Sequence, residues 1–450
     1  MTQVGGARIS GPLRSAIPTL AVAAVVGASV ARFVLAGGTT PVATSADAIR
    51  GNDAAATASA LEASVRLTPD DPDLLTRLGV VYLTRARQTA DPSFFTRAAE
   101  ALARSRTLGG DAERPATLTA QGLLALARHD FPAALELGTR AHQLDPASPD
   151  PLGVIVDAHV ELGRYEEAAA AAQDMVDRRP ALASLARVSY IRELNGDVSG
   201  AIGAMTQAAL AGAGSADDVA YVEALLGDLH LGAGDARRAD AAYLRSAASV
   251  PGFPAAEVGL ARVAAARGDL PAAIARLEAV VNRLPQPAWV ALLGDAYAAA
   301  GRADDAQAQY QLVRQIESLN RSNGVAVDLE LARFEADHAS DPGAQPAVAV
   351  EMARTAAAAR PTVFAADTLA WALRQAGQAE EALPHALDAV RLGTADGVLW
   401  YHLAVVEDDL GMTDSARDHV VRALGVSPFL TIRDLPGARA LAARLGVPIG

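Results

Sequence analysis

A recurrence of small residues every 33 to 38 positions constrains this 450-residue chain more than any other feature. Between the markers, apolar residues follow helical spacing, and no alternating run is long enough to predict a sheet. The markers are Ala134, Ala168, Ala201, Ala239, Ala273, Ala306, Ala382 and Ala416. The step from Ala306 to Ala382 spans two periods with inserted residues, and Ala349 is the expected marker between them. A period of this length predicts stacked supersecondary units.

Glycines and prolines recur in phase with these alanines. A Gly beyond a helix end permits the left-handed turn, and a Pro after the second helix stops it and restricts the residue before it. The glycines are Gly163, Gly196, Gly234, Gly268, Gly301, Gly377 and Gly411, and the prolines are Pro146, Pro180, Pro251, Pro285, Pro361 and Pro428. Each period therefore predicts two helices joined by a Gly turn.

This pattern resembles the tetratricopeptide repeat (TPR) family over about residues 54–430. The unit AWVALLGDAYAAAGRADDAQAQYQLV carries Leu293, Gly294, Tyr297, Gly301, Ala306 and Tyr310 at the family's positions. The unit LWYHLAVVEDDLGMTDSARDHVVRALGVSP carries Trp400, Leu403, Gly411, Ala416, Ala423 and Pro428. The layout also resembles exported or membrane-anchored TPR proteins of high-GC bacteria. The resemblance implies an all-α, right-handed α-solenoid of about ten helix pairs.

Two segments depart from the period. RARQTADPSFFTR delays Ala98 in the first full repeat, and a second insertion stretches the spacing near Asn323-Gly324 and Asp341-Pro342. Insertions in repeat proteins map to loops that carry function, or they simply lengthen helices and turns.

The N-terminus reads as a membrane segment or an export signal. No charge interrupts residues 15–31, and with Arg32 near one end the segment 15–37 could span a bilayer. Arg8 and Arg14 precede it and favour a cytoplasmic N-terminus at residues 1–14. A cleaved signal peptide and a buried cytosolic helix are the alternatives. Residues 38–53 read as a linker, and residues 431–450 as a C-terminal capping helix.

The composition excludes several chemistries. The chain has no Cys, which rules out thiol nucleophiles. It also has no Lys, so all 39 basic residues are Arg, and phosphate-loop lysines and Schiff-base lysines are ruled out. The net charge is −13, which disfavours nucleic acid as a partner. No catalytic motif appears, and no two of the eight His residues are spaced i, i+4. The sequence therefore predicts no enzyme and no cofactor.

The resemblance places the partner-binding surface on the concave face, which the first helix of each unit lines in TPR arrays. Its inner positions here are Asp157, Glu161, Tyr190, Glu193, Tyr221, Asp228, Arg262, Asp295, Asp367, Trp371, Arg374, Tyr401, Asp408 and Asp409. Most are acidic, so a basic protein or peptide is the electrostatically favoured partner. The same acidic positions are also expected if these residues only keep an Ala-rich surface hydrated and bind no partner.

These observations predict a non-catalytic scaffold that holds a partner protein or peptide in its groove. It would be anchored in the cell membrane by a single pass with the repeats outside the cytoplasm, or secreted after signal cleavage. An accessory binding protein for a divalent cation or transported solute is the alternative. For that function, the candidate cation ligands are His402, Glu407, Asp408, Asp409, Asp418 and His419.

Overall fold

The structure is a computed structural model, and it describes residues 54–110, 113–326, 328–339, 341 and 344–448. Over these ranges the chain forms 22 helices and no strand, which confirms the all-helical prediction. The predicted anchor or signal segment 15–37 lies outside the described residues. Within them, no helix combines the length and the apolar character that crossing a bilayer requires.

The helices follow one another as ten antiparallel pairs, with one helix before them and one after. The single helices are α2 (Ala54–Leu67) and α23 (Asp434–Arg444). The first five pairs are α3 (Pro72–Thr89) with α4 (Ser93–Leu108), α5 (Pro115–Ala127) with α6 (Phe131–Leu144), α7 (Asp150–Glu161) with α8 (Tyr165–Arg178), α9 (Leu182–Leu194) with α10 (Val198–Ala211), and α11 (Ala216–Gly232) with α12 (Ala236–Ser249). The last five are α13 (Pro254–Ala266) with α14 (Leu270–Arg283), α15 (Pro287–Ala299) with α16 (Ala303–Ser322), α17 (Asp328–Asp337) with α18 (Pro346–Ala359), α19 (Val363–Gln375) with α20 (Ala379–Ala389), and α21 (Gly397–Asp409) with α22 (Thr413–Val426).

The turn inside each pair has a local cause in the sequence. All seven turn glycines of the sequence pattern have φ between 67° and 82°, the left-handed region that glycine enters without strain. In four pairs the residue after the turn position is an Asp that caps the second helix by accepting a backbone N–H three residues on, at 2.8 to 3.2 Å. The turn and the cap together end one helix and start the next.

The marker alanines stand where paired helices touch. Ala134 is the fourth residue of α6, and the corresponding residue of α8, α10, α12, α14, α16, α18, α20 and α22 is also a marker alanine. All nine, Ala349 included, are at most 2% exposed. A larger side chain at this position would push the helices apart, because protein interiors are closely packed.

Both insertions found in the sequence lengthen helices. α3 has 18 residues and α16 has 20, whereas most other helices have 12 to 14. The added length of α16 carries the following residues across to α5 and α6. Val325 there joins the hydrophobic cluster of the first helix pairs.

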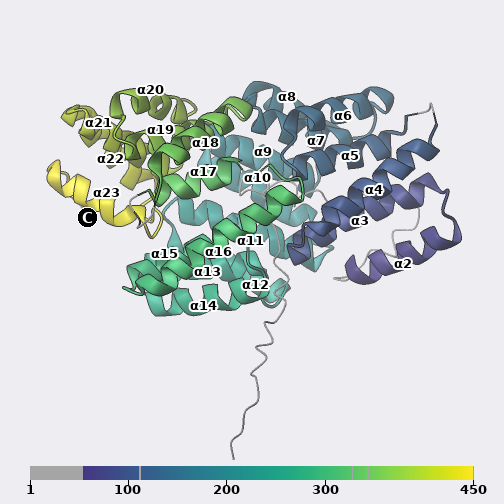
Figure 1. The fold of residues 1–450 in the computed structure, drawn as a ribbon, viewed down its shortest axis with the longest axis horizontal. Coiled ribbons are helices and arrows are strands. Elements are labelled where there is room, and N and C mark those ends of the chain that lie inside the picture. The colour runs from purple at the N-terminus through teal and green to yellow at the C-terminus, as the bar shows by residue number, and fades with distance from the viewer. Residues whose placement is uncertain (1–53, 111–112, 327, 340, 342–343, 449–450) are drawn as a thin grey trace, which may run out of the picture.

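The array coils until its own turns touch. We call the connections inside helix pairs the turn edge, and the connections between successive pairs the linker edge. The turn edge of the first five pairs lies against the linker edge that follows the sixth to tenth pairs, and we call this contact the seam. Figure 1 shows α8 beside α18, far apart in sequence but adjacent in space. The seam joins Ala90 with Leu284, Arg128 with Ala326, Gly163 with Pro361, Gly196 with Gly393 and Gly234 with Pro428.

Hydrogen bonds tie the seam together. The Ala326 amide donates to the Arg128 carbonyl at 3.1 Å, and the Val363 amide donates to the Tyr165 hydroxyl at 3.0 Å. The Thr394 hydroxyl donates to the Leu194 carbonyl at 2.6 Å. Side-chain hydrogen bonds across the seam link residues 197 to 200 positions apart, so one superhelical turn takes about six repeats.

Candidate functional site

The predicted inner residues all lie on the first helices of the pairs, several of them are buried, and most of their charges are already paired. The Asp157 carboxylate of α7 accepts two hydrogen bonds from the Arg187 guanidinium of α9, at 2.8 and 2.7 Å. Both side chains are at most 3% exposed. A buried two-point Arg–carboxylate contact fixes geometry, so this pair sets how α7 and α9 lie.

Glu161 takes part in the seam. Its carboxylate accepts from the Arg360 guanidinium at 2.6 Å, and Arg360 also donates to Glu330 at 2.8 Å. Glu161 and Arg360 are buried and Glu330 is partly exposed. Arg360 follows α18, so the triad joins the third pair to the eighth pair and to the linker after it. Arg360 also lies over the Phe131 ring, 4.9 Å from its centroid, where the ring face attracts the cation.

His129 completes this contact from the α5–α6 turn. It stands where later repeats have the turn glycine, and its φ is 61° although it is not glycine. Its buried ring lies with Nδ1 next to the Ala326 carbonyl oxygen and 3.8 Å from Glu330. Burial lowers the pKa of His129, so the ring is neutral at pH 7.

Two predicted acids hold equivalent positions two repeats apart. Asp228 accepts from the Tyr243 hydroxyl at 2.8 Å and from Arg262 at 2.6 Å. Asp295 accepts from the Tyr310 hydroxyl at 2.9 Å, and its Oδ1 lies 3.2 Å from His338 Nε2. Arg433 also reaches Asp295, at 3.5 Å.

Arg433 belongs to a segment between α22 and α23 that runs back onto earlier repeats. Phe429 packs on the cluster that contains Leu231 and Tyr243, and Ile432 packs on the cluster of α13 to α17. Arg433 also donates to Asp341 at 3.2 Å. Burial opposes the charge of Arg433, but Asp295 and Asp341 outweigh it and raise its pKa.

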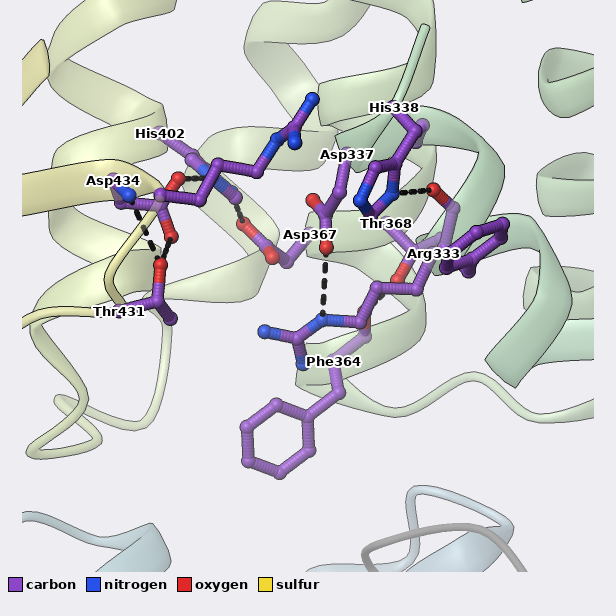
Figure 2. Close-up of polar contacts among 12 residues, drawn as sticks. Arg333, Asp337, His338, Phe364, Asp367, Thr368, His402, Thr431 and Asp434 are labelled. Carbon is purple, nitrogen blue, oxygen red and sulfur yellow. Dashed lines mark hydrogen bonds and ion pairs between the residues drawn. The ribbon is translucent and has the colours of Figure 1, made fainter. Parts of the chain in front are cut away.

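Another polar group, centred on the buried His402, lies among α17, α19, α21 and the start of α23 (Figure 2). His402 Nδ1 is 2.9 Å from Asp367 Oδ1, and its Nε2 is 3.9 Å from Asp434 Oδ1. The imidazole stacks on Trp371 with ring centroids 3.9 Å apart and planes 7° apart. Burial by itself would lower the pKa of His402, but Asp367 and Asp434 outweigh it and raise the pKa to about 10. His402 is therefore a buried cation at pH 7, held between carboxylates and an indole face.

Arg333 and Asp337 of α17 lie beside this group. Their side chains approach to 3.9 Å and remain 40% and 27% exposed. Burial raises the pKa of Asp337 to about 6, although Arg333 opposes the rise. Figure 2 shows Asp337 between Arg333 and the His402 group.

The remaining residues predicted from the sequence lie on the first helices α9, α11, α19 and α21. Arg374 donates to Asp409 at 2.7 Å across α19 and α21, and Asp408 accepts from Arg444 of α23. Tyr190, Trp371 and Tyr401 are buried, and burial raises the pKa of Tyr401 to about 12. Glu193 and Tyr221 are partly exposed. A basic partner would have to compete with the arginines and His402 for most of these carboxylates.

The residues proposed for a cation site separate in space. His402 pairs with Asp367, and His419 pairs with Glu407 at 2.6 Å. Asp408 pairs with Arg444, and Asp409 pairs with Arg374. Within the described part of the chain, no group of three or more His, Asp or Glu side chains is placed to hold a metal ion.

Several residues of this surface were missed by the sequence analysis. Arg187, Arg360, Glu330 and Asp434 carry the ion pairs, yet nothing in the repeat pattern sets them apart from surface charges. His129 was detectable, because it stands 34 positions before Gly163.

Comparisons with known proteins agree with the repeat interpretation. Residues 125–188 and 230–295 match the tetratricopeptide repeat family model. No curated protein matches the chain.

Several solved structures are similar. The APC/C hetero-tetramer Cut9–Hcn1 is 14% identical, with 87% of this chain and 93% of that chain covered and a TM-score of 0.38. The TPR protein TTC0263 of Thermus thermophilus is 20% identical, with 43% and 98% covered and a TM-score of 0.36. The human IFIT1 dimer with m7Gppp-AAAA is 12% identical, with 83% and 86% covered and a TM-score of 0.47. On the match to the family model, residues 125–188 and 230–295 carry tetratricopeptide repeats.

Proposed function

We propose that this protein is a non-catalytic scaffold that holds a partner protein or peptide on the inner surface of its helix pairs. The observation that carries the proposal is that inner polar side chains of successive first helices are locked by one another. Asp157 with Arg187 and Arg374 with Asp409 each join neighbouring first helices. A surface fixed in this way loses little conformational entropy when a ligand binds.

The partner class follows from charge. The chain carries −13, so polyanions such as RNA or DNA meet overall repulsion, whereas basic proteins are attracted over long range. The paired carboxylates of the inner surface contribute less to this attraction than unpaired ones would. Overall charge therefore favours a basic partner, and Tyr221, the partly exposed aromatic residue of the predicted set, supplies contact area.

Affinity capture from detergent-solubilised membranes tests the proposal. Asp228 and Asp295 are poor targets, because reversing them would also break Tyr and Arg contacts. Glu193→Gln with Tyr221→Ala alters partly exposed inner positions instead. Arg178→Gln on the second helix α8 is the control. We expect the wild type and the control to retain the same partners and the double variant to lose them. Unchanged capture by a double variant that melts like the wild type would contradict the proposal.

We also propose that residues 15–37 tether the repeats on the outer side of the cell membrane, as in the exported proteins that the sequence resembles. The uncharged stretch 15–31, preceded by Arg8 and Arg14, supports this orientation. Protease treatment of intact cells followed by blotting for the N-terminus and the C-terminus tests it. The repeats should be digested, while a retained N-terminal fragment separates an anchor from a cleaved signal.

A further inference from the structure

The seam uses only half of each superhelical edge. It covers the turn edge of the first five pairs and leaves the turns of the sixth, seventh, ninth and tenth pairs uncovered. Between α17 and α18 of the eighth pair, Asp341 is instead bonded to Arg433. At Gly268, Gly301, Gly377 and Gly411 no neighbouring heavy atom lies within 4 Å of the place a Cβ would occupy. At Gly163, Gly196 and Gly234, by contrast, that place is in contact with residues of the seam.

The linker edge is divided in the same way. Where the seam covers it, a linker residue is buried: Leu284 is 7% exposed, Val325 2%, Thr362 4% and Thr394 3%. The linker edge of the earlier pairs is uncovered. Leucines at or next to the ends of the helices that lead into it stay exposed, namely Leu67, Leu108, Leu144 and Leu210, at 85%, 40%, 42% and 75%.

Leu284 shows how a leucine of the linker edge packs against the turn edge. It packs in one cluster with Ala90 of the α3–α4 turn and with Trp289. Each molecule thus has one uncovered linker edge with exposed leucines and one uncovered turn edge. The seam joins these same two kinds of edge inside the molecule.

We propose that the uncovered linker edge of one molecule binds the uncovered turn edge of a second copy, so that the seam continues from molecule to molecule. Because one superhelical turn takes about six repeats, the first pairs of the second copy would lie on the sixth to tenth pairs of the first. The two surfaces differ, so the contact is heterologous and open-ended, and it generates chains rather than closed dimers. The inference stands on the seam and does not require the proposed function.

Sedimentation velocity of the full chain in detergent tests this over a concentration series. The wild type should grow beyond a dimer of the 46.2 kDa chain as concentration rises. Leu67→Asp with Leu210→Asp blocks the linker edge. Gly377→Asn with Gly411→Asn blocks the turn edge, because at the covered glycines Gly163 and Gly196 a Cβ would meet the backbone of the facing linker. Asn tolerates the left-handed conformation better than most residues, and no neighbouring atom lies close at Gly377 or Gly411, so the second variant should keep its fold. Each variant should raise the protein concentration at which half of the molecules are associated by about tenfold or more.

Mixing the two blocked variants gives the sharpest outcome. One retains a turn edge and the other a linker edge, so the mixture should form a one-to-one dimer and nothing larger. Leu244→Asp, an exposed leucine in the middle of α12, is the control and should assemble like the wild type. A wild type that stays monomeric at every concentration would overturn the proposal, and so would blocked variants that assemble normally or a mixture that forms no dimer.

Discussion

At the residue scale, the inner surface works through pairs rather than free charges. The repeat register located Asp157, Asp228, Asp295 and Asp367 on the first helices. Apart from Arg262, it did not reveal their ion-pair partners, because residues such as Arg187 and His402 do not recur at the repeat spacing in these roles. Since a buried charge needs a partner, the pairs fix how neighbouring helices lie.

The Asp367–His402 pair gives the first prediction. Asp367→Asn removes a buried carboxylate and leaves the imidazolium against Trp371 with one distant carboxylate. We expect the free energy of unfolding at pH 7 to fall by about 3 to 5 kcal/mol, the usual cost of breaking a buried pair. Urea denaturation measures it. Asp174→Asn, in an exposed pair with Arg178, should change it by less than about 1 kcal/mol; equal effects would show that His402 is not held as a cation.

The pH dependence gives a second prediction. The folded pKa of His402 is about 10, above its ordinary value of 6.5, so the folded state binds this proton more tightly than the unfolded state. The stabilisation is complete below pH 6.5, declines as the pH rises, and is lost above about pH 10. The difference in unfolding free energy between the wild type and Asp367→Asn should therefore shrink between pH 7 and pH 10. A difference that stays constant over this range would contradict the assignment.

At the element scale, the helix pairs were largely predictable, because their signals are local. The turn glycines, the Asp caps and the marker alanines all act within one repeat. The seam was not predictable, because its contacts join residues nearly 200 positions apart. These residues fit together in space, but no recurring residue type in the sequence marks them. The lengthened α16 shows the limit. Its insertion was visible, but its contact with the α5–α6 turn was not.

Alanine variants at two glycines distinguish the cost of straining the turn from the cost of disrupting the seam. Gly163→Ala and Gly301→Ala both place a Cβ on a left-handed residue, which costs about 1 to 2 kcal/mol. At Gly163 the Cβ would also meet the Pro361 carbonyl, whereas at Gly301 it meets nothing. We expect Gly163→Ala to be more destabilising by a further 1 to 3 kcal/mol or so, the usual cost of overpacking. Equal losses in urea denaturation would mean that the seam is open at Gly163.

At the scale of the whole molecule, the seam turns a one-dimensional array into a closed superhelix. In an open solenoid each repeat contacts only its neighbours. Here the third pair also contacts the residues around Arg360 and Val363, through the Glu161 carboxylate and the Tyr165 hydroxyl. These contacts therefore fix the spacing between the two superhelical turns.

Thiol cross-linking across the seam tests this closure most directly, because the chain has no cysteine of its own. Asn195→Cys with Ala395→Cys places one thiol beside each end of the Leu194–Thr394 hydrogen bond. With a short bifunctional thiol reagent, we expect rapid intramolecular cross-linking of the folded double variant, none in either single variant, and much slower reaction in denaturant. A folded double variant that reacts no faster than the denatured chain would show that the superhelical turns do not touch.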